Sequence, residues 1–269
     1  CYGKASKGEA TPEEVLAAET SACPTMGACP NMGTANTMQI LTEALGMTFP
    51  GAATIPAVYT DKILSCRAMG RRIVQMVFED LKPSDIITKE ALENAVCMDL
   101  AIGGSTNATL HLPSIARELG IDLPIEMFDE INHQVPHIGN IFPSGQYLTE
   151  CFWFAGGIPY VQLLLKDMLD LNVMTVTGKT LGENLEDLQK DNFFERNVGY
   201  LNNYHINRDD VIIPPEKVTE KGSVAILKGN IAPEGSVVKY SAVAQSQRVF
   251  TGPARVFNEE EDAYQAVVD

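Results

Sequence analysis

Basic residues are scarce in this sequence. Lysine and arginine number 20 against 35 aspartates and glutamates, so the formal net charge of the 269-residue chain is −15. A charge of this sign repels nucleic-acid phosphates and anionic membrane surfaces, and we expect neither nucleic acid nor a membrane among the partners. An anionic small molecule would need a local positive point, such as a helix N-terminus or a bound metal ion.

Long apolar runs and cysteines are also few. No stretch approaches the roughly 18 consecutive apolar residues of a membrane span, and the first twenty residues lack the apolar centre of a signal peptide. Six cysteines in so long a chain are too few for a disulfide scaffold, so free thiols or metal ligands are the better interpretation. We therefore expect a soluble protein of the cytoplasm, which is a reducing compartment.

Helical signals fill the first two thirds of the chain. Thr11, Pro12 and Glu14 form a capping box that predicts a helix through about residue 20. Apolar residues at helical spacing predict amphipathic helices over 34–47 and 61–81. Further helices are expected over 88–102, 105–119, 124–132, 157–171 and 179–190.

Signals for β-structure lie mainly near the C-terminal end. A short β-rich run at 173–177 precedes a helix, and strand candidates separated by turn residues follow at 223–227, 236–240 and 254–257. The stretch 192–208 has five asparagines and no apolar period, which predicts an exposed, mobile linker. The expected class is α/β, with a helix-rich α/β domain over 1–208 and the start of a C-terminal β-barrel-like domain over 209–269.

The densest chemical signal is a loop rich in glycine and proline at 22–38, which contains Cys23 and Cys29 and leads into a helix. A helix N-terminus favours an anionic thiolate, the form that ligates iron or acts as a nucleophile. A small buried cysteine in a tight turn is the alternative from composition alone. A zinc site is not expected, because five residues lie between the two cysteines and the four histidines show no ligand spacing.

A second segment, G-G-S-T-N at 103–107, opens an expected helix and could present N–H groups to a carboxylate or phosphate. The alternative is a C-cap glycine followed by an N-cap serine. The candidate substrate-binding residues of this segment are Gly104, Ser105, Thr106 and Asn107.

The T-G-K-T sequence at 177–180 is similar to the end of a phosphate-binding P-loop. The first glycine of that motif would fall at Val173, so the match fails. A turn from strand to helix is the better interpretation.

These motifs, taken in order, resemble the dihydroxy-acid and 6-phosphogluconate dehydratase family. The cysteine segment is similar to the family pattern A-C-P-x-x-G-x-C-x-x-M-x-T-A-N-T-M, and the resemblance covers nearly the whole chain. The other matching blocks are D-L-K-P-S-D at 80–85, G-G-S-T-N at 103–107, G-G-I-P at 156–159, T-V-T-G-K-T-L at 175–181, L-K-G-N-I-A-P at 227–233 and G-P-A-R-V-F at 252–257.

The resemblance implies a hydro-lyase that removes water from a 2,3-dihydroxy acid or sugar acid to give a 2-oxo acid. It implies an iron-sulfur cluster (2Fe-2S or 4Fe-4S) whose open iron acts as a Lewis acid, and Mg²⁺ that holds the substrate carboxylate and 2-hydroxyl. Cys29 matches one cluster thiolate, whereas Cys23 matches no ligand position and is expected to be structural. A homodimer or a dimer of dimers is also implied.

Several family motifs have no counterpart in this chain. Members carry an upstream S-C-D-K motif with further cluster and Mg²⁺ ligands, and nothing before Cys29 matches it. The metal-binding glutamate and the serine base follow the G-P-A-x-V-F block in the family, so the base is expected beyond Asp269. Because the chain starts at Cys1 rather than Met and stops within an expected helix, we expect part of a larger protein that is not catalytic by itself.

The substrate and the class of protein stay open. The pair Met32-Gly33 resembles the sugar-acid branch more than the branch for branched-chain amino-acid biosynthesis, where Met-Tyr is usual. Dihydroxy-acid dehydratase of that biosynthesis is the alternative. Two other classes remain: a non-catalytic relative that serves as a binding or assembly subunit, and a thiol redox protein that uses Cys23 and Cys29.

Overall fold

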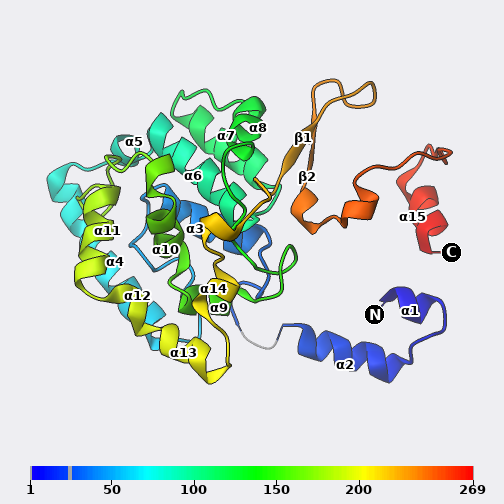
Figure 1. Ribbon diagram of the computed structural model, residues 1–269, viewed down its shortest axis with the longest axis horizontal. Coiled ribbons are helices and arrows are strands. Elements are labelled where there is room, and N and C mark those ends of the chain that lie inside the picture. The colour runs from blue at the N-terminus through cyan, green and yellow to red at the C-terminus, as the bar shows by residue number, and fades with distance from the viewer. Residues whose placement is uncertain (1, 24–25, 269) are drawn as a thin grey trace. The chain divides into compact units, whose positions relative to one another are not determined.

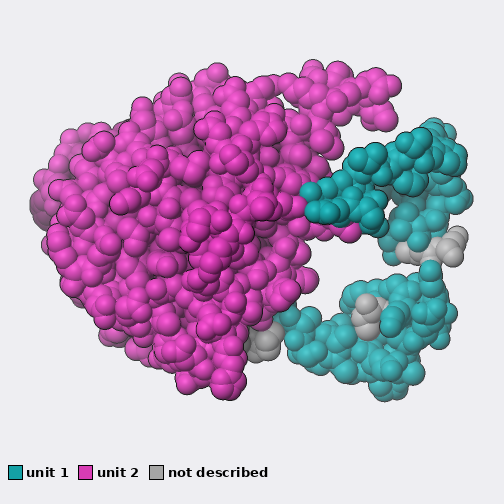
Figure 2. Space-filling view, viewed as in Figure 1, with its two compact units in different colours: residues 1–26, 245–269 teal, residues 27–244 magenta. Residues whose placement is uncertain are grey.

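A computed structural model describes residues 2–23 and 26–268 of the chain. The chain divides into two compact units (Figure 2): unit 1 consists of residues 1–26 and 245–269, and unit 2 of residues 27–244. No helix within the described ranges is both long enough and apolar enough to cross a bilayer.

The elements are labelled as in Figure 1. The helices are α1 Tyr2–Ser6, α2 Pro12–Ala22, α3 Thr34–Ala44, α4 Thr60–Glu79, α5 Pro83–Ile86, α6 Lys89–Ile102, α7 Ala108–Glu118, α8 Ile125–Asn132, α9 Thr149–Phe154, α10 Gly157–Leu164, α11 Leu181–Lys190, α12 Phe193–Arg196, α13 Val198–Asn203, α14 Arg208–Val211 and α15 Glu260–Val268. The short 3₁₀ turns are η1 Lys166–Met168, η2 Pro215–Lys217, η3 Tyr240–Ala242 and η4 Gln245–Gln247, and the strands are β1 Ala225–Leu227 and β2 Ser236–Val238.

Helix α6 is the centre of unit 2, and α3, α7, α8 and α10 all pack against it (Figure 1). Its sequence is apolar on nearly every side, which is typical of a helix surrounded by others. The helix begins where the Thr88 hydroxyl accepts the Ala91 N–H at 3.2 Å. It ends at Gly103, which adopts the left-handed conformation (φ 68°) that favours glycine.

The helices predicted from caps and periodicity are present, with ends that shift by a few residues. The capping box of α2 is confirmed: the Thr11 N–H donates to Glu14 at 2.8 Å, and the Glu14 N–H donates to the Thr11 hydroxyl at 3.3 Å. Helix α3 begins at Thr34 as expected and buries one face in the core of unit 2.

Helix α4 differs from expectation in the face that it buries. The apolar residues Ile63, Ile73 and Val77, which define its amphipathic pattern, are 54%, 56% and 73% exposed. Met76 is buried instead, and the Arg72 guanidinium, on the same edge, donates to the Val176 carbonyl at 2.5 Å. A mixed edge of the helix therefore faces the rest of unit 2, and a backbone acceptor lies opposite the arginine.

The β-structure is smaller than the sequence predicts. Strands β1 and β2 pair antiparallel, with Ile226 opposite Val237, and confirm two of the expected strands in shortened form. The expected strand at 254–257 is wrong, since those described residues have no strand partner. The expected strand at 173–177 is reduced to an isolated antiparallel bridge between Met174 and Thr180. The Thr175 N–H donates to the Lys179 carbonyl at 3.0 Å, which closes a turn. The class remains α/β, with helices in the majority.

The stretch 192–208 is helical rather than an irregular linker, although most of its residues are exposed as expected. This stretch contains α12, α13 and the start of α14, and it buries Phe194 and Leu201. Tyr200 stacks on Phe154 with ring centroids 4.9 Å apart. Its aromatic and leucine side chains thus pack on other parts of unit 2 without a regular period, so a search for periodicity misses them.

Candidate functional site

The cysteine loop, residues 27–33, is fastened to three elements of unit 2. Asn36, in the first turn of α3, is buried, and its side-chain amide donates to the carbonyls of Cys29 and, at 2.7 Å, Asn31. The Thr149 N–H at the start of α9 donates to the Pro30 carbonyl at 2.9 Å. The Met32 N–H donates to the Phe142 carbonyl at 2.8 Å, while the Cys29 thiol is free and exposed.

The G-G-S-T-N turn, residues 103–107, lies against the start of α3. The Ser105 and Thr34 hydroxyls are 3.2 Å apart, and the Asn107 side-chain amide donates to Thr34 Oγ1 at 2.7 Å. The Ser105 N–H donates to the Thr37 hydroxyl at 3.0 Å. The structure therefore brings together the two segments that the sequence marks as candidates, although 71 residues separate Thr34 from Ser105.

Most N–H groups of this turn already have partners within the protein. The Gly104 N–H donates to the Asp99 carbonyl at 2.8 Å, and the Asn107 N–H donates to the Ser105 hydroxyl at 3.2 Å. Gly103 is the C-cap of α6, as the capping interpretation predicts, but the N-cap of α7 is Asn107 rather than Ser105. A ligand at this turn would therefore meet side-chain groups of Ser105, Thr106 and Asn107 more than a row of backbone donors.

Three polar side chains beside the turn are absent from the sequence-based candidates. Asp99 is completely buried at the end of α6, and neither of its carboxylate oxygens has a hydrogen-bond partner. Burial raises the pKa of Asp99 to about 8, and the positive charge of Lys239 opposes that rise. A Cβ atom placed on Gly104 would lie 1.9 Å from Asp99 Oδ1, so only glycine permits this approach.

His137 and Lys239 complete this group. Burial lowers the pKa of His137 to about 4, and its buried Nε2 has no hydrogen-bond partner. The Lys239 ammonium donates to the Met32 carbonyl at 3.2 Å, and burial lowers the pKa of Lys239 to about 8. One sequence signal could have revealed Asp99, because it is the only charged residue in the apolar run 95–102.

The described residues by themselves do not fit a metal or cluster site. Among them, no three histidine, cysteine, aspartate or glutamate side chains lie close enough together to hold a metal ion. Cys23 and Cys66 are exposed free thiols, and burial raises the pKa of Cys97 to about 12. Cys1 lies outside the described residues.

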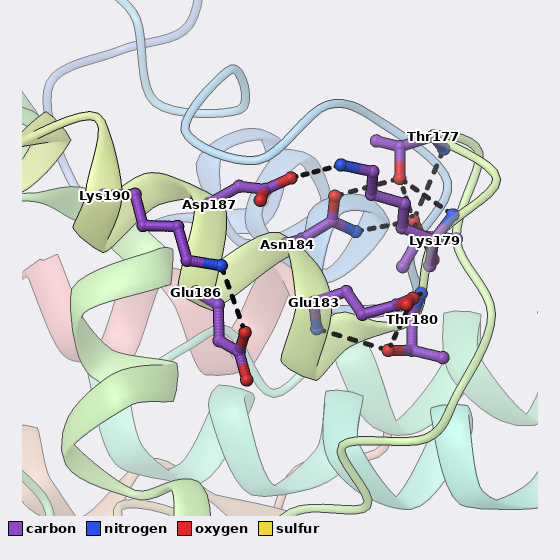
Figure 3. Close-up of polar contacts among 9 residues, drawn as sticks. Thr177, Lys179, Thr180, Glu183, Asn184, Glu186, Asp187 and Lys190 are labelled. Carbon is purple, nitrogen blue, oxygen red and sulfur yellow. Dashed lines mark hydrogen bonds and ion pairs between the residues drawn. The ribbon is translucent and has the colours of Figure 1, made fainter.

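The T-G-K-T segment is a turn whose polar groups are used internally (Figure 3). The Lys179 ammonium pairs with Asp187, and Thr180 forms a capping box with Glu183 that opens α11. The Thr177 hydroxyl donates to the Asn184 side-chain oxygen at 2.9 Å. These contacts agree with a turn into a helix and leave Lys179 paired with a carboxylate rather than a phosphate.

Comparison with known proteins decides the family. The family model described as "Dihydroxy-acid/6-phosphogluconate dehydratase N-terminal" matches residues 1–184, and the corresponding C-terminal model matches residues 210–269. The chain belongs to the dihydroxy-acid/6-phosphogluconate dehydratase family. The resemblance inferred from the motifs is thereby confirmed.

Three similar curated proteins share one name. The dihydroxy-acid dehydratase of Halothermothrix orenii is 45% identical over 99% of this chain and 46% of its own length. The proteins of the same name from Caldanaerobacter subterraneus subsp. tengcongensis and Methanothermobacter thermautotrophicus are each 44% identical over 98% of this chain. The chain spans slightly less than half the length of the relatives that it matches.

Proposed function

We propose that this chain is part of a dehydratase that converts a 2,3-dihydroxy acid to a 2-oxo acid, and that the cysteine loop and the G-G-S-T-N turn line its active site. One observation carries the proposal: Ser105 and Asn107 of the turn contact Thr34, the residue that directly follows the cysteine loop and begins α3. The relatives named above favour a dihydroxy acid over the sugar acid that Met32-Gly33 suggests.

The groups at the turn suit a polyhydroxylated acid. The Ser105 and Thr106 hydroxyls can donate and accept, and the Asn107 amide can do both, so they can bind substrate hydroxyl or carboxylate oxygens. Gly104 belongs to the same turn, where the absence of a side chain makes room for Asp99. We assign Gly104, Ser105, Thr106 and Asn107 to substrate binding and to orienting the substrate.

The cofactors of the family, an iron-sulfur cluster (2Fe-2S or 4Fe-4S) and Mg²⁺, form part of the proposal. Cys29 is the one thiol that the family pattern assigns to the cluster, and its exposure in unit 2 supports that role. The described residues supply no further ligand set for these groups and no assigned base.

Replacing Cys29 tests its role. In the anaerobically purified product of the complete reading frame, Cys29→Ser is expected to remove the visible iron-sulfur absorption. Cys66→Ser is the matched control, since Cys66 is also an exposed free thiol. Full retention of iron and sulfide by Cys29→Ser would contradict the assignment, and a reversible Cys23–Cys29 disulfide without iron would favour the thiol redox alternative.

Kinetics on a substrate panel test the binding turn. Ser105→Ala and Asn107→Ala are each expected to raise KM about fivefold, since one hydrogen bond is worth about 1 kcal/mol. Ser114→Ala is the control, because Ser114 lies on α7 and its hydroxyl donates only to the Leu110 carbonyl. The panel consists of 2,3-dihydroxyisovalerate and aldonic acids. An unchanged KM for both variants would remove the turn from the site, and absence of turnover would favour a non-catalytic relative.

Two larger-scale assignments accompany the function. We place a domain boundary near residue 208, with the start of a β-barrel-like domain after it. The gap between the two family matches, 184 to 210, supports this boundary.

We also propose that the complete protein is a homodimer or a dimer of dimers. The apolar side chains exposed on α4 support an oligomer, because exposed apolar patches often mark contacts between proteins. Sedimentation of the complete protein tests the oligomeric state.

A further inference from the structure

Helix α4 turns an apolar face away from the rest of unit 2. Of its 20 residues only Met76 is buried. Apolar residues scattered singly over a surface need no explanation, whereas a contiguous apolar patch marks a site of interaction with another molecule. We call the exposed apolar side chains of this helix the outer face of α4: Ile63, Leu64, Ile73, Val74, Val77 and Phe78.

The charges of α4 are divided along its length. Residues 62–78 contain four basic residues and no acidic one, whereas the acidic Glu79 and Asp80 end the helix. Arg67 and Arg71 are exposed, and neither has an ion-pair partner in the part of the chain that the structure describes. The helix is therefore basic in its middle and acidic at its C-terminal end.

A helix with this division of charge is complementary to a second copy of itself. When two such helices lie antiparallel, the basic stretch of each meets the acidic end of the other, and their dipoles point in opposite directions. If a two-fold axis passes between Ile73 and Val74, Arg67 and Asp80 are equally far from it along the chain. Arg67 of each copy then lies opposite Asp80 of the other, with apolar residues between them.

The overall charge favours the same face. A net charge of −15 makes two copies repel each other on average. A contact between copies is therefore most favourable where the local charge is positive, and residues 62–78 form such a stretch.

We propose that the outer face of α4 is the contact between two copies of this protein, with the two helices antiparallel around an axis between Ile73 and Val74. This rests on the oligomer proposed above and gives it a surface and a register. A two-fold contact is the commonest arrangement in homo-oligomers, and every residue pair in it occurs twice. The apolar side chains form the centre of the contact, and the two Arg67–Asp80 pairs lie toward its rim.

Sedimentation of the complete protein tests the surface. Val74→Lys places two ammonium groups beside the axis and is expected to halve the mass of the particle, because unpaired charges are costly in an apolar contact. Val74 is 54% exposed within the chain, so the fold of unit 2 tolerates the change. Leu227→Lys, at an equally exposed position on β1, is the matched control and should keep the mass. An unchanged mass in Val74→Lys, or a monomeric unsubstituted protein, would overturn the proposal.

Cross-linking between copies tests the register. In Val74→Cys the introduced thiols lie beside the axis, so a short bismaleimide is expected to join two copies at position 74. Cys66 is the internal control, since it is exposed on the same helix. The proposed register separates Cys66 from its own copy by about 22 Å, at 1.5 Å per residue. Mass spectrometry identifies the joined peptides, and links through Cys66 without any at position 74 would overturn the register.

A double-substitution cycle tests the charged contact. Arg67→Gln and Asp80→Asn are each expected to weaken association about fivefold, because an exposed ion pair contributes little but occurs twice. The double variant is expected to be no weaker than either single variant, since both remove the same pair. Asparagine tolerates the left-handed conformation of Asp80 (φ 55°). Additive effects of the two substitutions would overturn the Arg67–Asp80 contact.

These measurements need neither iron nor substrate. A protein that associates through α4 but lacks iron and turnover would contradict the proposed dehydratase and leave this contact intact. Conversely, an active protein whose association is insensitive to Val74→Lys would contradict the contact alone. Protection of Cys66 from alkylation in a monomeric complete protein would show that its own polypeptide covers α4, and would likewise overturn the proposal.

Discussion

Asn36 donates its side-chain amide to the carbonyl oxygen of Cys29, so the thiol loop is attached to the first turn of α3. The same amide donates to the Asn31 carbonyl at 2.7 Å and lies 3.3 Å from the Thr149 hydroxyl. A single buried side chain therefore sets the path of the loop and leaves the Cys29 thiol exposed. The T-A-N-T part of the motif thus has a structural role in addition to any chemical one.

Removing this amide is expected to release the loop. Asn36→Ala leaves at least two carbonyl acceptors in a partly buried place without their donor, which costs about 1–3 kcal/mol of unfolding free energy. Chemical denaturation measures this loss. Asn202→Ala, at an exposed asparagine of α13, is the control and is expected to change stability by less than about 0.5 kcal/mol. Equal effects of the two substitutions would contradict the role given to Asn36.

Glycine is required at position 104 and dispensable at position 70. In Gly104→Ala the new Cβ would lie 1.9 Å from Asp99 Oδ1 and 3.1 Å from the Thr37 methyl group, and we expect a loss of about 1–3 kcal/mol. In Gly70→Ala, within α4, nothing lies within 4 Å of the new Cβ, so we expect a gain of about 0.5–1 kcal/mol. Thermal unfolding of the two variants compares them, and a neutral Gly104→Ala would show that Asp99 lies elsewhere.

Glu43 is expected to make stability depend on pH. Burial raises its pKa to about 7, although N–H donors from Gly51 at 2.6 Å and Ala53 at 2.8 Å oppose the rise. Because the folded pKa exceeds the ordinary value of 4.5, the folded state holds this proton more tightly than the unfolded state does. The stability contributed by protonation is complete below pH 4.5 and is lost as the pH rises through about 7.

Urea denaturation between pH 4 and pH 8 measures this dependence. Glu43→Gln cannot ionise, so we expect a smaller fall in stability over that interval. The pKa of Asp99 is also raised, so Asp99 likewise makes the free energy of unfolding fall as the pH rises. This contribution remains in Glu43→Gln. Glu186→Gln, at an exposed site, is the control and should keep the full pH dependence of the unfolding free energy. The same pH dependence in Glu43→Gln would contradict a raised pKa for Glu43.

Neighbouring residues of α4 are expected to differ sharply in their contribution to stability. Met76 is 5% exposed, and Met76→Ala is expected to cost about 2–5 kcal/mol. Val77 is 73% exposed, and Val77→Ala is expected to change stability by no more than about 0.5 kcal/mol in the chain without partners. Denaturation midpoints provide the comparison, and a large loss for Val77→Ala would mean that the apolar face of α4 is covered.

Local signals predict this fold well where one side chain decides the backbone conformation. The capping box at Thr11, the start of α3 at Thr34 and the glycine at 103 that ends α6 all follow from short-range chemistry. The side of α4 that packs inward does not, because the Val176 carbonyl that binds Arg72 comes from a segment about 100 residues away. The missed helices at 193–203 are short and depend on aromatic packing rather than on periodicity.

For the candidate site, the sequence locates the segments but does not show their contacts. Cys29 and Ser105 stand out because of their motifs, whereas the contact between Ser105 and Thr34, which follows the cysteine loop, depends on how α3 packs against α6. Lys239 has no motif of its own that marks it, and it reaches the site only because the β1–β2 hairpin directs the chain back to Met32. Side chains that act through tertiary packing of this kind are not visible in a single sequence.

The central claim is that these residues form part of a dehydratase active site that includes the cysteine loop. Formation of 2-oxo acid from 2,3-dihydroxyisovalerate, after anaerobic reconstitution with iron, sulfide and Mg²⁺, tests it most directly. The complete reading frame is expected to turn over, and its Cys29→Ser variant and the 269-residue chain alone are expected not to, because the described residues hold no complete metal site. Turnover by the Cys29→Ser variant, or by the 269-residue chain at the rate of the complete protein, would contradict the account.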